Sequence, residues 1–379
     1  PASCFGDFIS LSEEHGCSHI TDRRTIGREY YQDDCRDGWA KGTVDIIDNT
    51  GPFSLQEVKS TEIELKKNPN YLFSRKADGF VIKATPLVTS WASNMEDGQT
   101  NLGIGIPKKA FTGLAGYHES ELKNLSVNLI WINHHSRVKH MKNKEFRKAI
   151  YYAINKTQML TDNLNHDAKL VSGPISDFSD FADREINDWT IGYGPPEYDE
   201  DYDKATQILE RIGYKIVERS GRKILFDDRN NQVKLSLLYH KNGITEGEED
   251  ALETAIKNLS KIGIDVEKDD QDFKNNFEKI KKSGEFDLCY DKITIEEPMD
   301  LLVYYHSKGV KNVSRFHHNQ VDNLLDNMKD VSAIQANNLA GDVWEILHKE
   351  ASSVFLWRMN SWYYFNRDYI GKGNMKYVN

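Results

Sequence analysis

The sequence predicts an α/β protein with two lobes, and three observations support this. The chain has 379 residues, which is too long for one ordinary hydrophobic core. Residues 232–290 follow the order strand, helix, strand, helix, strand, which is typical of a mostly parallel sheet. Residues 126–133 (SVNLIWIN) are apolar on both faces, as in a strand covered on both sides.

The first part of the chain is predicted to be rich in strands. Residues 49–71 open with a Gly-Pro turn, alternate apolar and polar residues in two stretches, and close with a second turn at Asn68-Pro69-Asn70. Turns at both ends of two half-buried strands predict a β-hairpin. Residues 78–106 predict a strand, a helical turn and a second strand.

Helices dominate the elements that follow. Apolar residues at helical spacing predict one amphipathic helix over 143–164. Acidic residues in the first turn and a C-terminal Gly213 predict a helix over 199–215. Two more helices, over 318–330 and 332–352, lead to an apolar strand at 353–359.

Composition excludes several classes of protein. The net charge of −10 argues against a nucleic-acid groove, which normally appears as a basic surface. No stretch reaches the roughly 18 apolar residues needed to cross a bilayer. The chain begins at Pro1 without a methionine or a signal-type segment, so we expect it to be processed or cut from a longer protein.

Cysteine and histidine residues give only a weak signal for a metal site. Three of the four cysteines lie in the first tenth of the chain near two histidines, but without a Cys-x-x-Cys pair. A disulfide in an exported protein, a metal site and unpaired thiols all stay open for this segment. Neighbouring histidines on a strand point to opposite faces and rarely bind one metal together. The residues concerned are Cys4, Cys17, Cys35, Cys289, His15, His19, His134, His135, His140, His317 and His318.

The order of these motifs resembles that of the extracytoplasmic solute-binding proteins of peptide and nickel ABC importers, solute-binding family 5. In that family a Gly-Thr-Gly-Pro-Tyr or Gly-Thr-Gly-Pro-Phe turn leads to a strand ending in Arg/Lys-Asn-Pro-x-Tyr-Trp. Residues 49–53 (NTGPF) and 67–72 (KNPNYL) stand in those places. Asn49 replaces the first glycine and Leu72 the tryptophan.

Further matches follow in the same order across residues 43–330. The stretch FRKAIYYAINKTQML is similar to the family's VRxAlxxAIDR helix, and GPIS to its GPIP loop. YDKATQILERIGY resembles YDPxKAkxLLxEAGY, and AIKNLSKIGIDVE resembles xqLkkiGIdve. GEFDLCY is similar to gdfDl, and NVSRFHHNQVDNLLDNM to NxxxYxnpevDxLl.

The resemblance implies a two-lobed, periplasmic-binding-protein-like fold of type II, the peptide-binder class. We expect residues 1–125 and 346–379 to form the first lobe and 126–345 the second. Only 50 residues precede the Gly-Pro turn, fewer than the family usually has. We therefore expect the N-terminal part of the first lobe to be missing.

The same resemblance implies function. We expect the substrate-binding component of an ABC importer, extracytoplasmic and monomeric, which binds a peptide-like or other small polar solute between its lobes. Its partners would be the permease subunits, without nucleic acid or cofactor. The alternative is the ligand-sensing domain of a transcription regulator, since some regulators carry this fold. An enzyme is not expected, because no Gly-x-Ser-x-Gly, His-Glu-x-x-His or other catalytic pairing occurs.

The resemblance also assigns ligand-binding residues, each with a structural alternative. Two glycines would allow close backbone approach or merely bend a strand. Two tryptophans would offer stacking area or belong to the core. Two glutamates would hold a cation or form a solvated loop, and an arginine would receive a carboxylate or neutralise a neighbouring acid. These residues are Gly103, Gly105, Trp131, Glu296, Glu297, Trp357 and Arg358.

Overall fold

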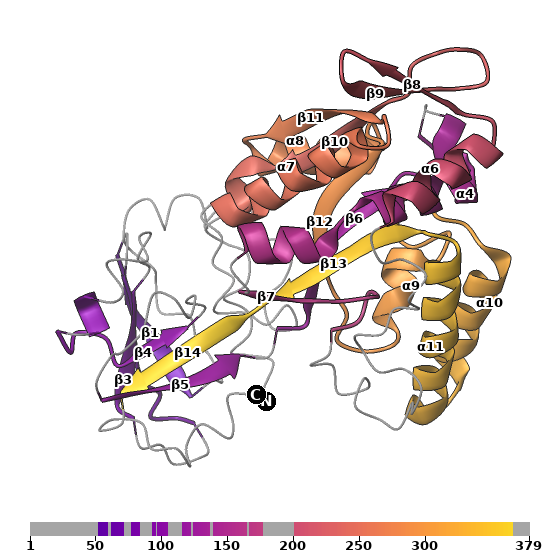
Figure 1. The fold of residues 1–379 in the computed structure, drawn as a ribbon. Coiled ribbons are helices and arrows are strands. Elements are labelled where there is room, and N and C mark those ends of the chain that lie inside the picture. The colour runs from indigo at the N-terminus through magenta and orange to yellow at the C-terminus, as the bar shows by residue number, and fades with distance from the viewer. Residues whose placement is uncertain are drawn as a thin grey trace. The chain divides into compact units, whose positions relative to one another are not determined.

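The computed structural model describes residues 52–59, 62–71, 77–83, 93–95, 97–104, 116–122, 124–136, 139–164, 167–176 and 201–366. The chain divides into two compact units (Figure 1). Unit 1 comprises Pro1–Ser120 and Trp362–Asn379, and unit 2 comprises Glu121–Ser361.

In unit 1, one antiparallel sheet has the order β1-β2-β3. Its strands are β1 (Phe53–Val58), β2 (Glu62–Lys67) and β3 (Gly79–Lys83). Leu55 pairs with Leu65, and the Asn68 amide closes the hairpin by donating to the Pro52 carbonyl at 3.1 Å. The predicted hairpin is confirmed.

A second sheet has the order β4-β14-β5, and it pairs strands from the two chain segments that make up unit 1. Its strands are β4 (Leu102–Ile104), β14 (Ser361–Asn366) and β5 (Tyr117–Leu122). The Tyr117 hydroxyl donates to the carbonyls of Met95 and Thr100 and so fixes the helical turn that precedes β4. The strand, turn and strand predicted over 78–106 are present.

Unit 2 is built on a six-stranded sheet of the order β11-β10-β12-β6-β13-β7. Its strands are β11 (Asp265–Gln271), β10 (Lys234–His240), β12 (Leu288–Thr294), β6 (Ser126–Ile132), β13 (Ser353–Met359) and β7 (Ala168–Leu170). β10 runs parallel to β11 and β12, as the strand-helix order predicts.

The sheet is mixed, which corrects the prediction of a mostly parallel sheet. β6 is antiparallel to both β12 and β13, and β13 is antiparallel to β7. The reason lies in the connections: β6 carries the chain into unit 2 and β13 carries it back. Two neighbouring strands that enter and leave the same unit run in opposite directions.

Helices cover both faces of this sheet, and β6 supplies apolar residues to both. Ile130 and Ile132 belong to one core cluster, and Val127, Leu129 and Trp131 to the other. The first cluster includes α4 (Lys144–Ala153), α6 (Tyr202–Arg211) and α7 (Glu246–Ser260). The second includes α8 (Lys274–Ser283), α9 (Asp300–Tyr305), α10 (Asn319–Asn327) and α11 (Ala333–Lys349).

The helix predicted over 143–164 is interrupted. α4 ends at Ala153, and α5 (Lys156–Gln158) and a π-helical turn, η3 (Met159–Asn163), follow it. Asn155 caps the new start by accepting a hydrogen bond from the Gln158 amide at 2.7 Å. Asparagine favours caps over helix interiors, and this preference outweighs the apolar spacing here.

Short elements complete unit 2. Lys215–Arg219 and Arg222–Phe226 pair as a β8–β9 hairpin, in which Ser220 and Gly221 both have positive φ. The remaining turns are η2 (Lys139–Lys142), η5 (Lys241–Gly243) and η6 (Met328–Asp330). Unit 2 extends to Ser361, beyond the residue 345 expected from the sequence, because β13 pairs with β6.

Candidate functional site

The connections after two neighbouring strands define the candidate site in unit 2. β10 and β12 are parallel neighbours. The chain leaves β10 for α7 on one face, and leaves β12 for α9 on the other. Open α/β sheets generally bind their ligands outside the carboxyl ends of the strands at such a reversal, so these strand ends are the candidate site. We name this the carboxyl edge; it comprises His240, Thr294 and Ser126, the β6 residue that pairs with Thr294.

A buried polar cluster lies on the α7 side of this edge. The Glu248 Oε1 atom accepts hydrogen bonds from Asn128 Nδ2 at 3.0 Å and from the Tyr290 hydroxyl at 2.7 Å. The Asn128 Nδ2 atom also lies 2.7 Å from the Tyr290 hydroxyl oxygen. On the other side, Glu248 Oε2 accepts from the amide and hydroxyl of Thr245 at 2.9 and 3.0 Å. One carboxylate thus joins β6, β12 and the start of α7.

The surroundings of Tyr290 in this cluster change the pKa of its hydroxyl group. Burial, followed by the neighbouring Glu248 carboxylate, raises the pKa of Tyr290 well above its usual value. Tyr290 therefore stays protonated and acts as a hydrogen-bond donor. We name Asn128, Thr245, Glu248 and Tyr290 the polar cluster.

The loop from β12 to α9 forms the other side of the carboxyl edge. The hydroxyl oxygens of Ser126 and Thr294 lie 2.8 Å apart. Asp300 Oδ2 accepts from the backbone amides of Glu296 and Glu297 at 2.8 and 3.0 Å, which fixes the course of the loop. Both glutamate side chains are exposed, and neither is ion-paired with a residue of the described ranges.

The two predicted tryptophans are core residues in this structure. Trp131 is 0% exposed, and its ring centroid lies 5.5 Å from that of Tyr305. Its indole N–H donates to the Asp291 carboxylate at 3.4 Å. Trp357 is also fully buried, but in the cluster on the opposite face of the sheet. Both rings therefore belong to the core, which was the structural alternative, and the alternation of strand residues places them on opposite faces of the sheet.

The remaining predicted residues are dispersed. Arg358 is buried, and its Nη1 atom lies 3.2 Å from Glu121 and 2.7 Å from the Asn360 amide oxygen. It neutralises a neighbouring acid, which was the structural alternative. Gly103 is buried on β4 opposite Tyr364, and Gly105 lies outside the described residues.

The sequence contained a signal for the polar cluster that the motif comparison missed. Asn128 is the polar residue inside the otherwise apolar stretch VNLIWI. A buried amide needs a partner, which implies a second polar residue from another element. Thr245 and Glu248 also have the spacing of a capping box, which the structure contains.

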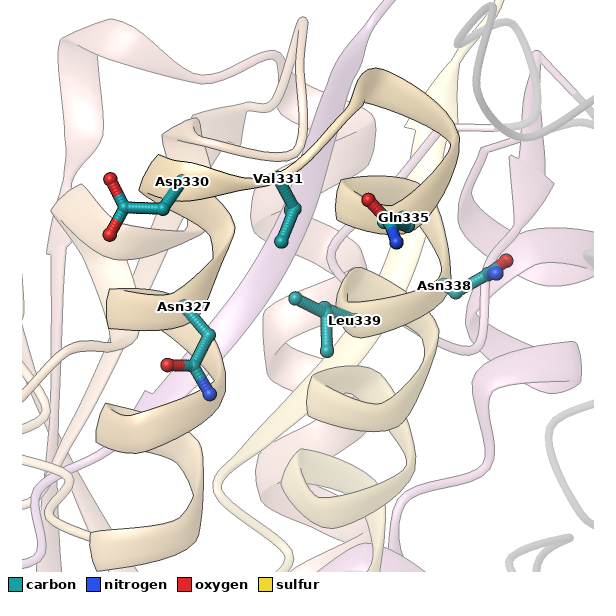
Figure 2. A pocket seen from close by; sticks show the side chains of 6 residues that line it. All are labelled: Asn327, Asp330, Val331, Gln335, Asn338 and Leu339. Atoms are coloured by element: carbon teal, nitrogen blue, oxygen red, sulfur yellow. The ribbon is translucent and has the colours of Figure 1, made fainter.

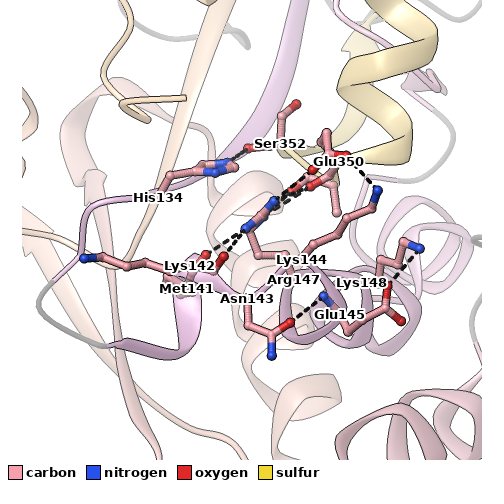
Figure 3. Close-up of polar contacts among 11 residues, drawn as sticks. His134, Met141, Lys142, Asn143, Lys144, Glu145, Arg147, Lys148, Glu350 and Ser352 are labelled. Carbon is pink, nitrogen blue, oxygen red and sulfur yellow. Dashed lines mark hydrogen bonds and ion pairs between the residues drawn. The ribbon is translucent and has the colours of Figure 1, made fainter. Parts of the chain in front are cut away.

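Arg147, the arginine of the FRKAI motif, has a structural role (Figure 3). Its guanidinium is almost fully buried and donates to the carbonyls of Glu350 at 2.7 Å and Ala351 at 3.3 Å, at the end of α11. It also donates to the carbonyls of Met141 and Lys142 at 3.0 and 3.2 Å. A buried cation is thus matched to the negative end of a helix dipole.

His134 lies beside this arginine (Figure 3) and donates from Nε2 to the Ser352 carbonyl at 3.3 Å. Burial, and then the charge of Arg147, lower the pKa of His134 to about 3. Burial also lowers the pKa of His348 on α11 to about 3. Both imidazoles are neutral at physiological pH.

A hollow of about 420 Å³ lies between the end of α10 and the start of α11 (Figure 2). Its lining comprises Asn327, Asp330, Val331, Gln335, Asn338 and Leu339. It opens widely to solvent, and none of the predicted ligand residues borders it. Enclosed, mostly apolar cavities are the usual sites of small molecules, so this hollow is a weak candidate.

The described residues contain no group of three or more His, Cys, Asp or Glu side chains arranged to hold a metal ion. Cys289 is a buried free thiol, and Cys4, Cys17 and Cys35 lie outside the described ranges. Among the helices described, none combines the length and apolar character needed to span a membrane.

Comparison with known proteins identifies relatives. Residues 28–313 match the family model "Bacterial extracellular solute-binding proteins, family 5 Middle". The oligopeptide-binding protein AppA of Bacillus subtilis is 21% identical over 296 residues, which are 75% of this chain and 51% of AppA. This chain therefore spans about half the length of that curated relative.

Solved structures agree on the fold. The structure of B. subtilis AppA in complex with a nonapeptide has a TM-score of 0.66 at 20% identity, and the match covers 86% of this chain and 65% of that one. NikA from Brucella suis in complex with Fe(III)-EDTA has a TM-score of 0.68 at 20% identity, and the match covers 84% and 64%. Both likenesses support the two-lobed α/β fold expected from the sequence.

Proposed function

The chain belongs to family 5 of the bacterial extracellular solute-binding proteins, and we propose that it is the substrate-binding component of an ABC importer. The match to the family model over residues 28–313 carries this proposal. The carboxyl edge of unit 2 supports the proposal, because open α/β sheets generally bind ligands outside the carboxyl ends of their strands.

The ligand that we propose is a peptide-like or other small polar solute. AppA is named an oligopeptide-binding protein, and its solved complex contains a nonapeptide. On this chain, the exposed carboxylates of Glu296 and Glu297 supply acceptors beside Thr294. These two glutamates remain proposed ligand residues, and so do Gly103 and Gly105.

The proposed partners are the permease subunits of the importer, and the proposed location is outside the cytoplasmic membrane, in the periplasm or at the membrane surface. The family is one of extracellular proteins, which supports this location. A monomer remains our expectation. Neither the family model nor the relatives reported above favour the transcription-regulator alternative.

Binding of a peptide pool tests the proposal. The chain would be unfolded, freed of carried ligands, refolded and mixed with a pool of peptides of three to nine residues. Native mass spectrometry should then detect complexes of one chain with one peptide. Persistence of the free chain alone, at peptide concentrations up to millimolar, would contradict the proposal.

A binding protein should also leave its ligand intact. We propose that the chain has no hydrolytic or transfer activity, in keeping with a family of solute binders. Peptides recovered after prolonged incubation should keep their masses. Cleavage that is abolished by substitution of one carboxylate of this chain would overturn this part.

A further inference from the structure

The β8–β9 hairpin has two chemically different faces. It lies at the margin of unit 2, outside the six-stranded sheet, and contacts α6 and α7 (Figure 1). Side chains alternate along each strand and directly paired residues share a face, so the register assigns every residue of the hairpin to one face. The inner face carries Leu225, which is fully buried, and Ile216, which packs against the same core cluster. We name the opposite face the basic face; it comprises Lys215, Val217, Arg219, Arg222, Ile224 and Phe226.

The basic face holds three cations and no acidic side chain. Lys215, Arg219 and Arg222 are exposed, and among the described residues no carboxylate oxygen lies within 4.0 Å of their side-chain nitrogens. The inner face, in contrast, has one charge of each sign, Glu218 opposite Lys223. The chain has 59 acidic and 49 basic residues, so a face with cations alone does not follow from its composition.

The two arginines supply a second observation. Arg219 and Arg222 lie directly opposite each other, on either side of the turn at Ser220 and Gly221. Like charges at opposing positions of an antiparallel pair destabilise it, whereas the neighbouring pair of Glu218 and Lys223 combines opposite charges. Guanidinium groups bind phosphate groups well, so an external phosphate would relieve the repulsion between the arginines.

Apolar side chains lie among these cations. Val217 is 36% exposed, and Ile224 and Phe226 are half-buried. The guanidinium carbon of Arg219 lies 5.8 Å from the centroid of the Phe226 ring, so the arginine lies along the ring and keeps its charge at the surface. Cations around exposed apolar side chains are typical of segments that lie in the headgroup region of a bilayer. Lipid headgroups also adapt to an exposed face, whereas a protein partner has to match its shape.

We propose that the basic face binds the surface of a membrane that contains anionic phospholipids. Lys215, Arg219 and Arg222 contact the phosphate groups, and Val217 meets the apolar boundary beneath them. This inference goes beyond the proposed function, because it concerns a surface of the chain and not its solute. The net charge of −10 does not prevent the contact, because charges more than about 8 Å from the membrane are largely screened at physiological ionic strength.

Binding of the whole chain to lipid vesicles tests the proposal. Vesicles of phosphatidylcholine alone are compared with vesicles in which about one third of the lipid is phosphatidylglycerol, and the bound fraction is measured by sedimentation. We expect binding to the anionic vesicles and not to the neutral ones, with a marked loss between about 0.1 M and about 0.5 M salt. Arg222→Gln should weaken binding about fivefold, which is the factor for one cation at an anionic membrane surface.

Lys223→Gln is the matched control. It removes the same charge from the adjacent exposed position, but from the inner face of the hairpin. We expect it to weaken binding by less than about twofold, because its charge lies farther from the membrane and is screened. Both positions are exposed, so both variants should unfold at the wild-type temperature. Equal effects of the two substitutions on binding would show that net charge and not the basic face decides, and would overturn the proposal.

Three further results would also contradict it. Equal binding to both kinds of vesicle would exclude a role for anionic headgroups. Displacement of the bound chain by millimolar glycerol phosphate at constant ionic strength would assign the basic face to a soluble phosphate compound instead. If neither kind of vesicle binds the chain, the membrane proposal is wrong, and an acidic protein surface becomes the partner to seek. Peptide binding is measured separately, so the proposed function does not depend on any of these results.

Discussion

At the scale of single residues, buried charge in unit 2 is compensated in two different ways. Arg147 is surrounded by carbonyl oxygens and a carboxylate, and its hydrogen bonds join the end of α11 to the turn before α4. Glu248 accepts hydrogen bonds from neutral donors only, and these bonds join β6, β12 and the start of α7.

Replacement of Arg147 by alanine should strongly destabilise the protein. It leaves the carbonyls of Glu350 and Met141 without a donor and Glu350 without its cation. We expect a loss of about 3–5 kcal/mol in the free energy of unfolding, measured by chemical denaturation. Arg211→Ala is the control, since Arg211 forms an ion pair with Glu145 at the exposed surface and should contribute at most about 1 kcal/mol. Equal effects of the two substitutions would contradict this interpretation.

Acid should destabilise the protein through its buried histidines. The folded-state pKa values of His134 and His348 are about 3, below the usual value of 6.5. The unfolded chain therefore takes up protons first, so the free energy of unfolding should fall as the pH drops below about 6.5 and continue to fall until about pH 3. In His134→Gln, an amide can still donate to Ser352, and the slope over this range should be smaller. An unchanged slope would show that His134 does not contribute.

At the scale of elements, two glycines with positive φ follow two consecutive α-helices of unit 2. Gly213 follows α6 with φ +96°, and Gly263 follows α7 with φ +85°. Both belong to motifs that the sequence comparison singled out, ERIGY and SKIGI. Their surroundings differ: a Cβ at Gly213 would have no neighbour within 4 Å, whereas one at Gly263 would approach Leu225 N to 2.7 Å and Ile224 C to 2.9 Å.

The two positions should therefore respond differently to alanine. Gly213→Ala should cost about 1–2 kcal/mol, which is the strain of a left-handed backbone alone. Gly263→Ala should cost at least about 1 kcal/mol more, because β9 must also move away from the methyl group. Thermal and chemical denaturation of both variants measure the difference. A Gly213→Ala variant as unstable as Gly263→Ala would mean that the contact with β9 is unimportant.

The elements also show what local sequence can and cannot predict. Strands and helices with clear apolar patterns, such as β6 and the β10–β12 region, were predictable because the spacing of apolar residues follows from which faces of the element are buried. The direction of β6 and β13 was not, since it depends on how the chain enters and leaves the unit. The site is harder still. Trp131 and Trp357 have similar apolar surroundings in sequence, yet the alternation of strand residues and a register shift in β13 send them to different cores.

At the scale of the whole molecule, unit 2 has the properties of an independent domain. Glu121–Ser361 contains a six-stranded sheet with a core cluster on each face, and the β8–β9 hairpin. The division of the chain into two lobes stays a prediction that this property makes testable. A fragment of residues 121–361 should unfold cooperatively and should become less stable with falling pH, as the whole chain does. A fragment without a cooperative transition would mean that unit 2 needs the rest of the chain to fold.

The central claim is that this chain binds a solute and does not transform it. Isothermal titration calorimetry with the peptide that native mass spectrometry selects tests it most directly, provided that the peptide is recovered and weighed afterwards. We predict a saturable isotherm with one site per chain and full recovery of the intact peptide. No saturable heat at any concentration up to millimolar, or a steady heat of reaction with cleaved peptide in the cell, would contradict the claim.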